Sequence, residues 1–109
     1  MIAVLIEFRV RPGQDDAFRA AWTETTEYIR ARFGSLGSRL HRAGDGRYVG
    51  YAQWPDRETY DRDHAWDESG RAIRQRMADT LLEGRGRVLD ILDVDIDRLT
   101  REPADEPVS

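Results

Sequence analysis

The chain has 109 residues and a mass of 12.6 kDa, which fits one domain. It contains no cysteine, which excludes disulfides, thiolate metal ligands and cysteine nucleophiles. Every basic residue is arginine and no asparagine is present, so neither a Schiff-base lysine nor an orienting asparagine is available. The net charge is −4, and acidic and basic residues are mixed along the chain. Because no basic face stands out, we do not expect nucleic-acid binding. No apolar run nears membrane-spanning length and no basic segment precedes the apolar N-terminal stretch, so we expect a cytoplasmic protein.

Residues 2–10 alternate with a period of two, which predicts a β-strand. One face is wholly apolar and consists of Ile2, Val4, Ile6, Phe8 and Val10. The other face carries Ala3 and Leu5 and then Glu7 and Arg9, two charged residues that we expect to form ion pairs across a dimer or with Asp93.

Residues 14–33 predict a helix between Pro12-Gly13 and Gly34. Its apolar stripe recurs at spacings of three and four and consists of Phe18, Trp22, Thr25, Ile29 and Phe33. Residues 36–43 and 47–54 then flank Gly44-Asp45-Gly46, which predicts a hairpin. Within the second run, Gly50 indicates either a bulge or a close approach of another group.

A second helical region is predicted from an N-cap at Asp56 to about Glu83, with a break near Ser69-Gly70. Residues 88–96 predict the fourth strand, with Leu89 and Ile91 on one face. We assign residues 1–98 to one domain and residues 99–109 to a mobile acidic C-terminal tail.

The element order is β-α-β-β-α-β, which predicts an α+β, ferredoxin-like fold. In that fold a four-stranded antiparallel sheet carries both helical regions on one face. We expect the helix-free face to expose Ala3, Leu5, Leu89 and Ile91. Because such an apolar face is rarely left in water, we predict a homodimer through it.

Several segments together carry a family resemblance. They are Val10-Arg11-Pro12-Gly13 before the first helix, Gly34 after it, and Tyr51-Ala52-Gln53-Trp54-Pro55-Asp56 leading to Glu58-Thr59-Tyr60 and His64. On these residues the chain resembles the antibiotic biosynthesis monooxygenase family of dimeric α+β barrels over residues 2–96. The resemblance implies a pocket between sheet and helices in each subunit. Some members oxidise polycyclic phenols or quinols without metal or flavin, and others bind and degrade haem.

The chain departs from the haem-degrading members. Those members use an asparagine on the first strand with a tryptophan and a histidine on the second helical region. This chain has no asparagine, and the corresponding later positions fall at Asp63 and near Ile73. The resemblance therefore implies a monooxygenase without a cofactor. A metal site that joins His41 and His64 has no supporting ligand spacing.

His64 is the candidate catalytic base, since imidazole titrates near neutral pH and a deprotonated phenol can react with dioxygen. The alternative is a surface or packing histidine beside Asp61, Asp63 and Asp67. The candidate residues for binding a small aromatic ligand are Trp54, Tyr60, Trp66, Trp22 and Tyr51. The alternative for these rings is that they fill the core, which the helical stripe favours for Trp22.

Three alternative functions are compatible with these residues. The first is a cofactor-independent monooxygenase that acts on an aromatic, phenolic or quinol-type small molecule. The second is a non-catalytic dimeric barrel that binds a small ligand or haem, with His64 or His41 as the axial ligand. The third is a dimerisation module whose aromatic residues all serve packing.

Overall fold

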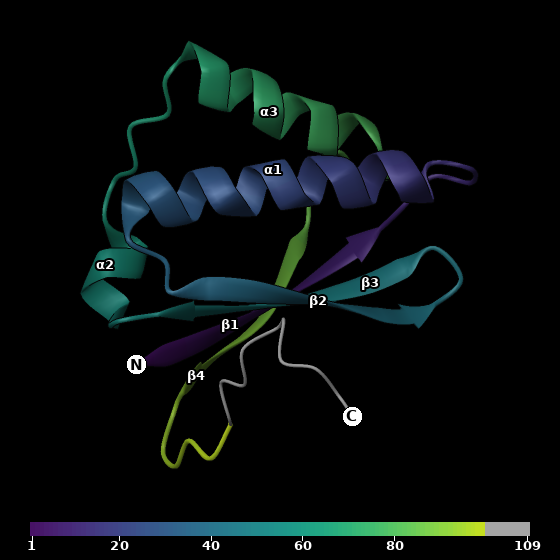
Figure 1. Cartoon of the computed structure of the whole chain (residues 1–109). Helices are drawn as coiled ribbons and strands as arrows, with labels where there is room; N and C mark the ends of the chain where they lie inside the picture. Colours follow the sequence, from purple (N-terminus) through teal and green to yellow (C-terminus); the bar gives the residue numbers. More distant parts are fainter. Residues whose placement is uncertain (100–109) are drawn as a thin grey trace, which may run out of the picture.

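The computed structural model describes residues 1–99. Its elements are β1 (Ile2–Arg9), α1 (Asp15–Phe33), β2 (Gly37–Gly44), β3 (Arg47–Trp54), α2 (Arg57–Asp61), α3 (Glu68–Asp79) and β4 (Arg87–Asp93). The strands form one antiparallel sheet in the order β2-β3-β1-β4, and the helices lie over one face of it (Figure 1). The predicted ferredoxin-like α+β fold is therefore confirmed. Apart from Leu99, the predicted acidic tail lies outside the described residues.

The alternation of β1 decides which side of the sheet becomes the core. Val4 is fully buried in a cluster with Ile2 and Trp54, and Phe8 packs with Phe18 of α1 in a second cluster. Both clusters lie between the sheet and the helices. The predicted apolar face of β1 is thus the face that the helices cover.

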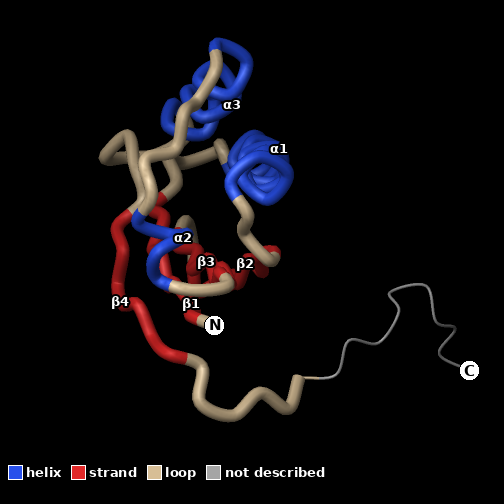
Figure 2. Tube along the Cα trace, turned by 90° about the vertical axis from the view of Figure 1, so that its left-hand side faces the viewer, coloured by secondary structure: helices blue, strands red, loops and turns tan. Residues whose placement is uncertain are grey.

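The two longer helices take different roles above the sheet. α1 ends at Gly34, which adopts the left-handed conformation with a φ of 88° and so acts as the predicted C-cap. α3 packs against α1 rather than directly on the strands, so it is raised away from β4 (Figure 2).

The second helical region breaks earlier than predicted. It divides into α2 and α3, with residues 62–67 between them, whereas Ser69 and Gly70 belong to the first turn of α3. The reason is a cap at Asp67, whose carboxylate accepts a hydrogen bond from the Gly70 amide at 2.7 Å. Glycine is required here by space rather than by a break, because a Cβ on Gly70 would lie 2.3 Å from the Tyr28 ring. The region also ends at Asp79 and not near Glu83.

The fourth strand differs from the prediction in length and in register. It ends at Asp93, which pairs with Ile2, the first residue of β1, and beyond this pair the Val94 amide donates to the Met1 carbonyl oxygen at 3.0 Å. A bulge between the pairs Leu5–Asp90 and Ile6–Val88 reverses the expected alternation. As a result Ile91 packs under the helices with the Ile2 cluster and is not on the helix-free face.

The helix-free face keeps an apolar centre in spite of that correction. Leu92 pairs with Ala3 and takes the place that was predicted for Ile91, with 44% of its surface exposed.

Of the helices in residues 1–99, none is both long enough and apolar enough to cross a membrane.

Candidate functional site

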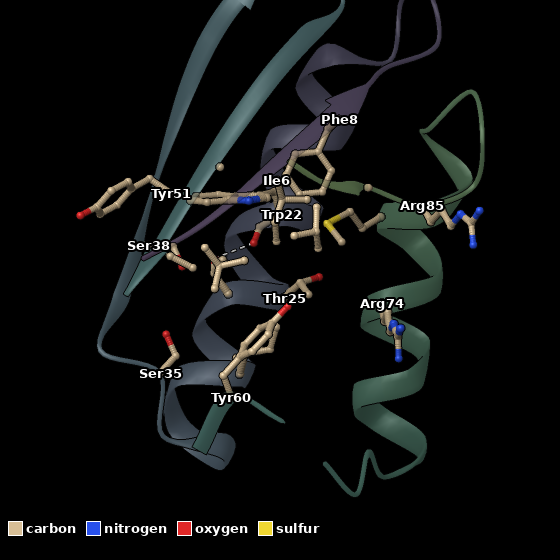
Figure 3. A pocket seen from close by; sticks show the side chains of 18 of the residues that line it. Ile6, Phe8, Trp22, Thr25, Ser35, Ser38, Tyr51, Tyr60, Arg74 and Arg85 are labelled. Atoms are coloured by element: carbon tan, nitrogen blue, oxygen red, sulfur yellow. Dashed lines mark hydrogen bonds between the residues drawn. The ribbon is translucent and has the colours of Figure 1, made fainter. Parts of the chain in front are cut away.

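A cavity of about 650 Å³ lies between the sheet and the helices (Figure 3). Its floor comes mainly from the helix-facing positions of β1 and β3. Its walls come from α1, α3, the end of α2 with His64 beyond it, and residues 84–86 before β4. The lining is mainly apolar and aromatic, with a few hydroxyl and charged groups at its edges. This composition and size are typical of a small-molecule pocket.

His64 lines the cavity and is held there on several sides. Its ring stacks against Phe33, with ring centroids 4.5 Å apart, and against Trp54, with centroids 5.5 Å apart. Its Nε2 lies 3.1 Å from the Thr59 carbonyl oxygen. A carbonyl oxygen can only accept, so Nε2 carries the hydrogen and Nδ1 is the basic nitrogen of the neutral ring.

Trp54 and Tyr60 line the same end of the cavity as His64. Trp54 ends β3 and is 5% exposed, and its ring meets Tyr60 edge-on at 5.5 Å. Tyr60 lies in α2, which ends at Asp61, whereas His64 lies in the following segment. The two side chains reach the cavity from different elements.

Trp22 lines the cavity from the middle of α1 and is half-buried. It also packs against the cluster of Phe8 and Phe18, so it serves the core and the cavity wall together. Gly50 lies opposite it on β3, where a Cβ would approach the Phe8 ring within 3.2 Å. Of the two readings of Gly50, the structure therefore shows the close approach.

Tyr51 and Trp66 lie differently from the other predicted ligand residues. Tyr51 contributes to the lining, but its ring points away from the cavity (Figure 3), because Gly50 and Ala52 hold the helix-facing positions of β3. Trp66 is not part of the lining. Its ring stacks on Tyr28 with centroids 5.1 Å apart.

The segment 62–67, which carries His64 and Trp66, is fastened to α1 through Asp67. The Asp67 carboxylate accepts hydrogen bonds from the Gly70 amide, the Tyr28 hydroxyl at 2.9 Å and Arg32 at 2.8 Å. These bonds, the first of them most, lower the pKa of Asp67 to about 2. A charged Asp67 therefore fixes the segment at neutral pH.

The charged groups along the lining favour anions over cations. Arg74 of α3 and Arg85 both line the cavity, and the Arg74 guanidinium lies 5.0 Å above the Trp66 ring. Asp61 is the acidic residue of the described lining, and its carboxylate is bonded to Arg57 at 2.9 Å. A neutral or anionic ligand meets no unpaired carboxylate there.

Sequence reasoning missed two residues of the site. Phe33 was assigned to the core stripe of α1, yet it forms one wall of the His64 stack. Arg74 follows Ile73 directly, and nothing in the sequence distinguished it from other exposed arginines. His41 lies on β2 opposite Val49, on the helix-free face, so the structure does not bring it to the site of His64.

The family model for antibiotic biosynthesis monooxygenase matches residues 1–75 of the chain. The match covers more than half of the sequence and includes β1 through most of α3. The chain therefore belongs to the antibiotic biosynthesis monooxygenase family, and the predicted resemblance is confirmed. Among curated proteins, no sequence matches the chain.

Solved structures share the fold over nearly the whole described region. A protein of Bordetella bronchiseptica, described as a candidate antibiotic biosynthesis monooxygenase, is 18% identical with a TM-score of 0.71, covering 87% of this chain and 97% of its own. SnoaB, a cofactor-independent oxygenase from Streptomyces nogalater, is 16% identical with a TM-score of 0.69, covering 89% and 95%. Rv0793 from Mycobacterium tuberculosis is 22% identical with a TM-score of 0.65, covering 90% and 98%.

Proposed function

We propose that this protein is a cofactor-independent monooxygenase that oxidises a small aromatic phenol or quinol in the cavity beside His64. The observation that carries the proposal is the position of His64 in an aromatic cavity, with its ring stacked against Phe33 and Trp54 and Nε2 bonded to the Thr59 carbonyl. Membership of the monooxygenase family supports it, as does the fold shared with SnoaB, which is described as a cofactor-independent oxygenase.

In this proposal His64 acts through Nδ1. The ring stacks against Phe33 and Trp54, and Nε2 is bonded to the Thr59 carbonyl oxygen, so Nδ1 is the ring nitrogen left to accept a proton from a ligand. Nδ1 accepts the proton of a phenolic hydroxyl, and the resulting phenolate is electron-rich enough to reduce dioxygen. The ring stack and the bond to Thr59 keep the base in one orientation.

The overall reaction balances without an added reductant. For 1-naphthol, one oxygen atom of dioxygen forms a second carbonyl to give 1,4-naphthoquinone, and the other leaves as water. The substrate supplies all four electrons, and its hydroxyl hydrogen and ring hydrogen end in that water. The protein has to bind the ring, remove one proton and exclude competing bases.

The same geometry favours this function over haem binding. His64 is the one histidine of the described lining, and ligation of iron by its Nε2 requires loss of the bond to Thr59. We therefore expect a haemin titration to give no saturable shift of the Soret band. A saturable shift that His64→Ala abolishes would favour the haem-binding alternative.

The proposed active form is a cytoplasmic homodimer. The apolar centre of the helix-free face, with Leu5 and Leu92 on neighbouring strands, supports pairing of two subunits through this face. The cavity lies on the other side of the sheet and stays open in such a dimer.

Oxygen uptake with 1-naphthol tests the base. Because general base catalysis contributes roughly a hundred-fold or more, His64→Ala should lower the rate above buffer background by at least about 100-fold. His41→Ala is the matched control, since His41 lies on the opposite face of the sheet, and its rate should equal that of the wild type. Equal rates for both variants would refute the assignment of His64.

A further inference from the structure

The segment 62–67, which joins α2 to α3 and carries His64, is held mainly by side chains. Its backbone is hydrogen-bonded where it leaves α2 and where Asp67 begins α3. Among the described residues, 63–66 form no backbone–backbone hydrogen bond. A segment with few backbone bonds opens locally unless other contacts hold it. The place of His64 therefore depends on the side chains that fasten this segment to its neighbours.

Tyr28 of α1 holds Asp67, the last residue of the segment, through two hydrogen bonds. Its hydroxyl donates to the Asp67 carboxylate at 2.9 Å and accepts from the Asp67 amide at 3.2 Å. One hydroxyl thus binds both the side chain and the backbone of the same residue. Arg32 donates to that carboxylate as well, at 2.8 Å, and its guanidinium lies 4.9 Å from the centroid of the Tyr28 ring. The end of the segment is therefore tied to α1 by Tyr28 and Arg32 together.

The Tyr28 ring also lies behind the wall against which His64 stacks. It stacks on Trp66 with centroids 5.1 Å apart and meets Phe33 edge-on at 5.7 Å. Phe33 and Trp66 are themselves 5.1 Å apart, so each of these three rings contacts the other two. His64 then stacks on Phe33 at 4.5 Å. Tyr28 therefore reaches His64 by two routes, one along the chain from Asp67 and one through the Phe33 ring.

The hydroxyl of Tyr28 has a separate role from its ring. Tyr28 does not belong to the described lining of the cavity, so its effect on a ligand passes through His64. Tyr28→Phe would keep the ring contacts with Trp66 and Phe33. It would remove both bonds to Asp67, which leaves the Asp67 amide without this partner and weakens the hold on the carboxylate.

We infer that Tyr28 is a positioning residue for His64. Through Asp67, its hydroxyl holds the segment 62–67 where the His64 ring stacks on Phe33 and Nε2 meets the Thr59 carbonyl oxygen. The inference rests on the proposed function for the role of His64 as a base, and it adds the residue that keeps this base in place. Placement matters because a displacement of about 1 Å can lower a rate by up to about 100-fold.

The other end of α1 provides a matched control. The Tyr48 hydroxyl donates to Asp15 at 2.6 Å and accepts from Arg19 at 3.1 Å, so it bonds to a carboxylate and lies beside an arginine as Tyr28 does. Tyr48 is buried and is not part of the described lining. Tyr48→Phe therefore removes bonds of the same kind from α1 without touching the segment 62–67.

The first readout is the proton NMR spectrum of the His64 ring at about pH 8, where a free imidazole is neutral. The chain has two histidines, so His41→Ala assigns the signals. Because the ring stacks against Phe33 and Trp54, its protons should resonate upfield of those of free imidazole. We expect Tyr28→Phe to move them toward the free position and Tyr48→Phe to leave them unshifted.

Arg32→Gln provides a second variant that does not depend on how well Tyr28→Phe folds. Arg32 is exposed, and its loss removes one bond to the Asp67 carboxylate but keeps the Tyr28 hydroxyl. The His64 signals should therefore move in the same direction as in Tyr28→Phe, by a smaller amount.

The second readout is oxygen uptake with 1-naphthol. Tyr28→Phe should lower kcat about ten-fold and change KM by less than about two-fold, because the base is displaced while the ligand loses no contact. Tyr48→Phe should keep both constants. A general loss of stability would affect the two tyrosine variants alike.

The failures of the two proposals look different. Unshifted His64 signals in both Tyr28→Phe and Arg32→Gln, or equal shifts in Tyr28→Phe and Tyr48→Phe, overturn the inference about Tyr28. The proposed function stands in that case if His64→Ala abolishes oxygen uptake. If the wild type takes up no oxygen above buffer, the proposed function is overturned, and the ring shifts still decide whether Tyr28 positions His64.

Discussion

Gly70→Ala tests the contact that holds α3 and the segment of His64 onto α1. Gly70 lies in the first turn of α3 against Tyr28, and an added Cβ would lie 2.3, 2.5 and 2.7 Å from three atoms of the tyrosine side chain. These distances are far below van der Waals contact. The tyrosine must therefore move, and its hydroxyl then leaves Asp67, which caps the same helix.

The magnitude follows from two opposing effects. Overpacking of this kind costs about 1–3 kcal/mol. Replacement of glycine by alanine in a helix favours folding by about 0.5–1 kcal/mol, because alanine loses less backbone entropy. We therefore expect Gly70→Ala to lower the free energy of unfolding by about 1–2 kcal/mol, or Tm by roughly 5–10 °C for a domain of this size.

Urea denaturation followed by circular dichroism measures this change. Ser69→Ala is the matched control, because Ser69 is the exposed neighbour in the same turn and should change stability by less than about 0.5 kcal/mol. The double variant Tyr28→Ala/Gly70→Ala should show no further loss from the alanine at position 70, since the clashing ring is gone. A Gly70→Ala variant as stable as wild type, or more stable, would refute the described packing of α1 and α3.

Two carboxylates, of Asp67 and Glu7, and one exposed leucine, Leu92, allow three further tests. The pKa of Asp67 is about 2 in the folded chain and near 3.8 when unfolded, so its contribution to stability is present above pH 4 and lost as pH falls toward 2. The decrease of Tm with falling pH should therefore be smaller in Asp67→Asn than in the wild type. The pKa of Glu7 is lowered from 4.5, chiefly by its bond from Arg47, so Glu7→Gln should lower Tm at pH 7, and this difference should shrink as the pH falls below 4.5. A difference that stays the same in acid would contradict the ion pair. Leu92→Arg should yield a monomer in light scattering. Leu82 is a comparably exposed leucine outside the sheet, so Leu82→Arg should leave the dimer intact. A wild-type protein that is monomeric would contradict the proposed interface.

The fold followed from the sequence where local patterns and tertiary structure agree. The alternation of β1, the helix before Gly34 and the Gly44-Asp45-Gly46 hairpin each have a strong local signal, and all three elements form as predicted. Their order then allows few topologies, so the ferredoxin-like arrangement could be inferred without any long-range information.

The departures arise where distant residues decide. We predicted a helix break at Ser69-Gly70. Residue 70 is glycine because the Tyr28 ring, which is remote in sequence, leaves no room for a Cβ there. The bulge beside Asp90 changes the alternation of β4 and exchanges the faces of Ile91 and Leu92. A pattern of period two carries no signal for such an inserted residue. Within the subunit, Arg47 and Arg87 of neighbouring strands bind the Glu7 carboxylate, and Arg9 lies 3.8 Å from it. Ion pairs of Glu7 and Arg9 across a dimer stay a prediction.

For the candidate site, the sequence identified residue types better than orientations. His64, Trp54, Tyr60 and Trp22 were singled out as chemically capable, and the structure places all four around one cavity. Tyr51 was singled out for the same reason, yet its strand position turns the ring to the other face. Whether these residues bind or transform a ligand remains a prediction for the experiments above.

The most direct test of the central claim is the oxidation of 1-naphthol by the purified protein under ¹⁸O₂, with mass spectrometry of the product. We predict 1,4-naphthoquinone with one ¹⁸O atom, formed faster than in buffer by the wild type and by His41→Ala but not by His64→Ala. A quinone that carries no label, or equal formation with and without the protein, would contradict it.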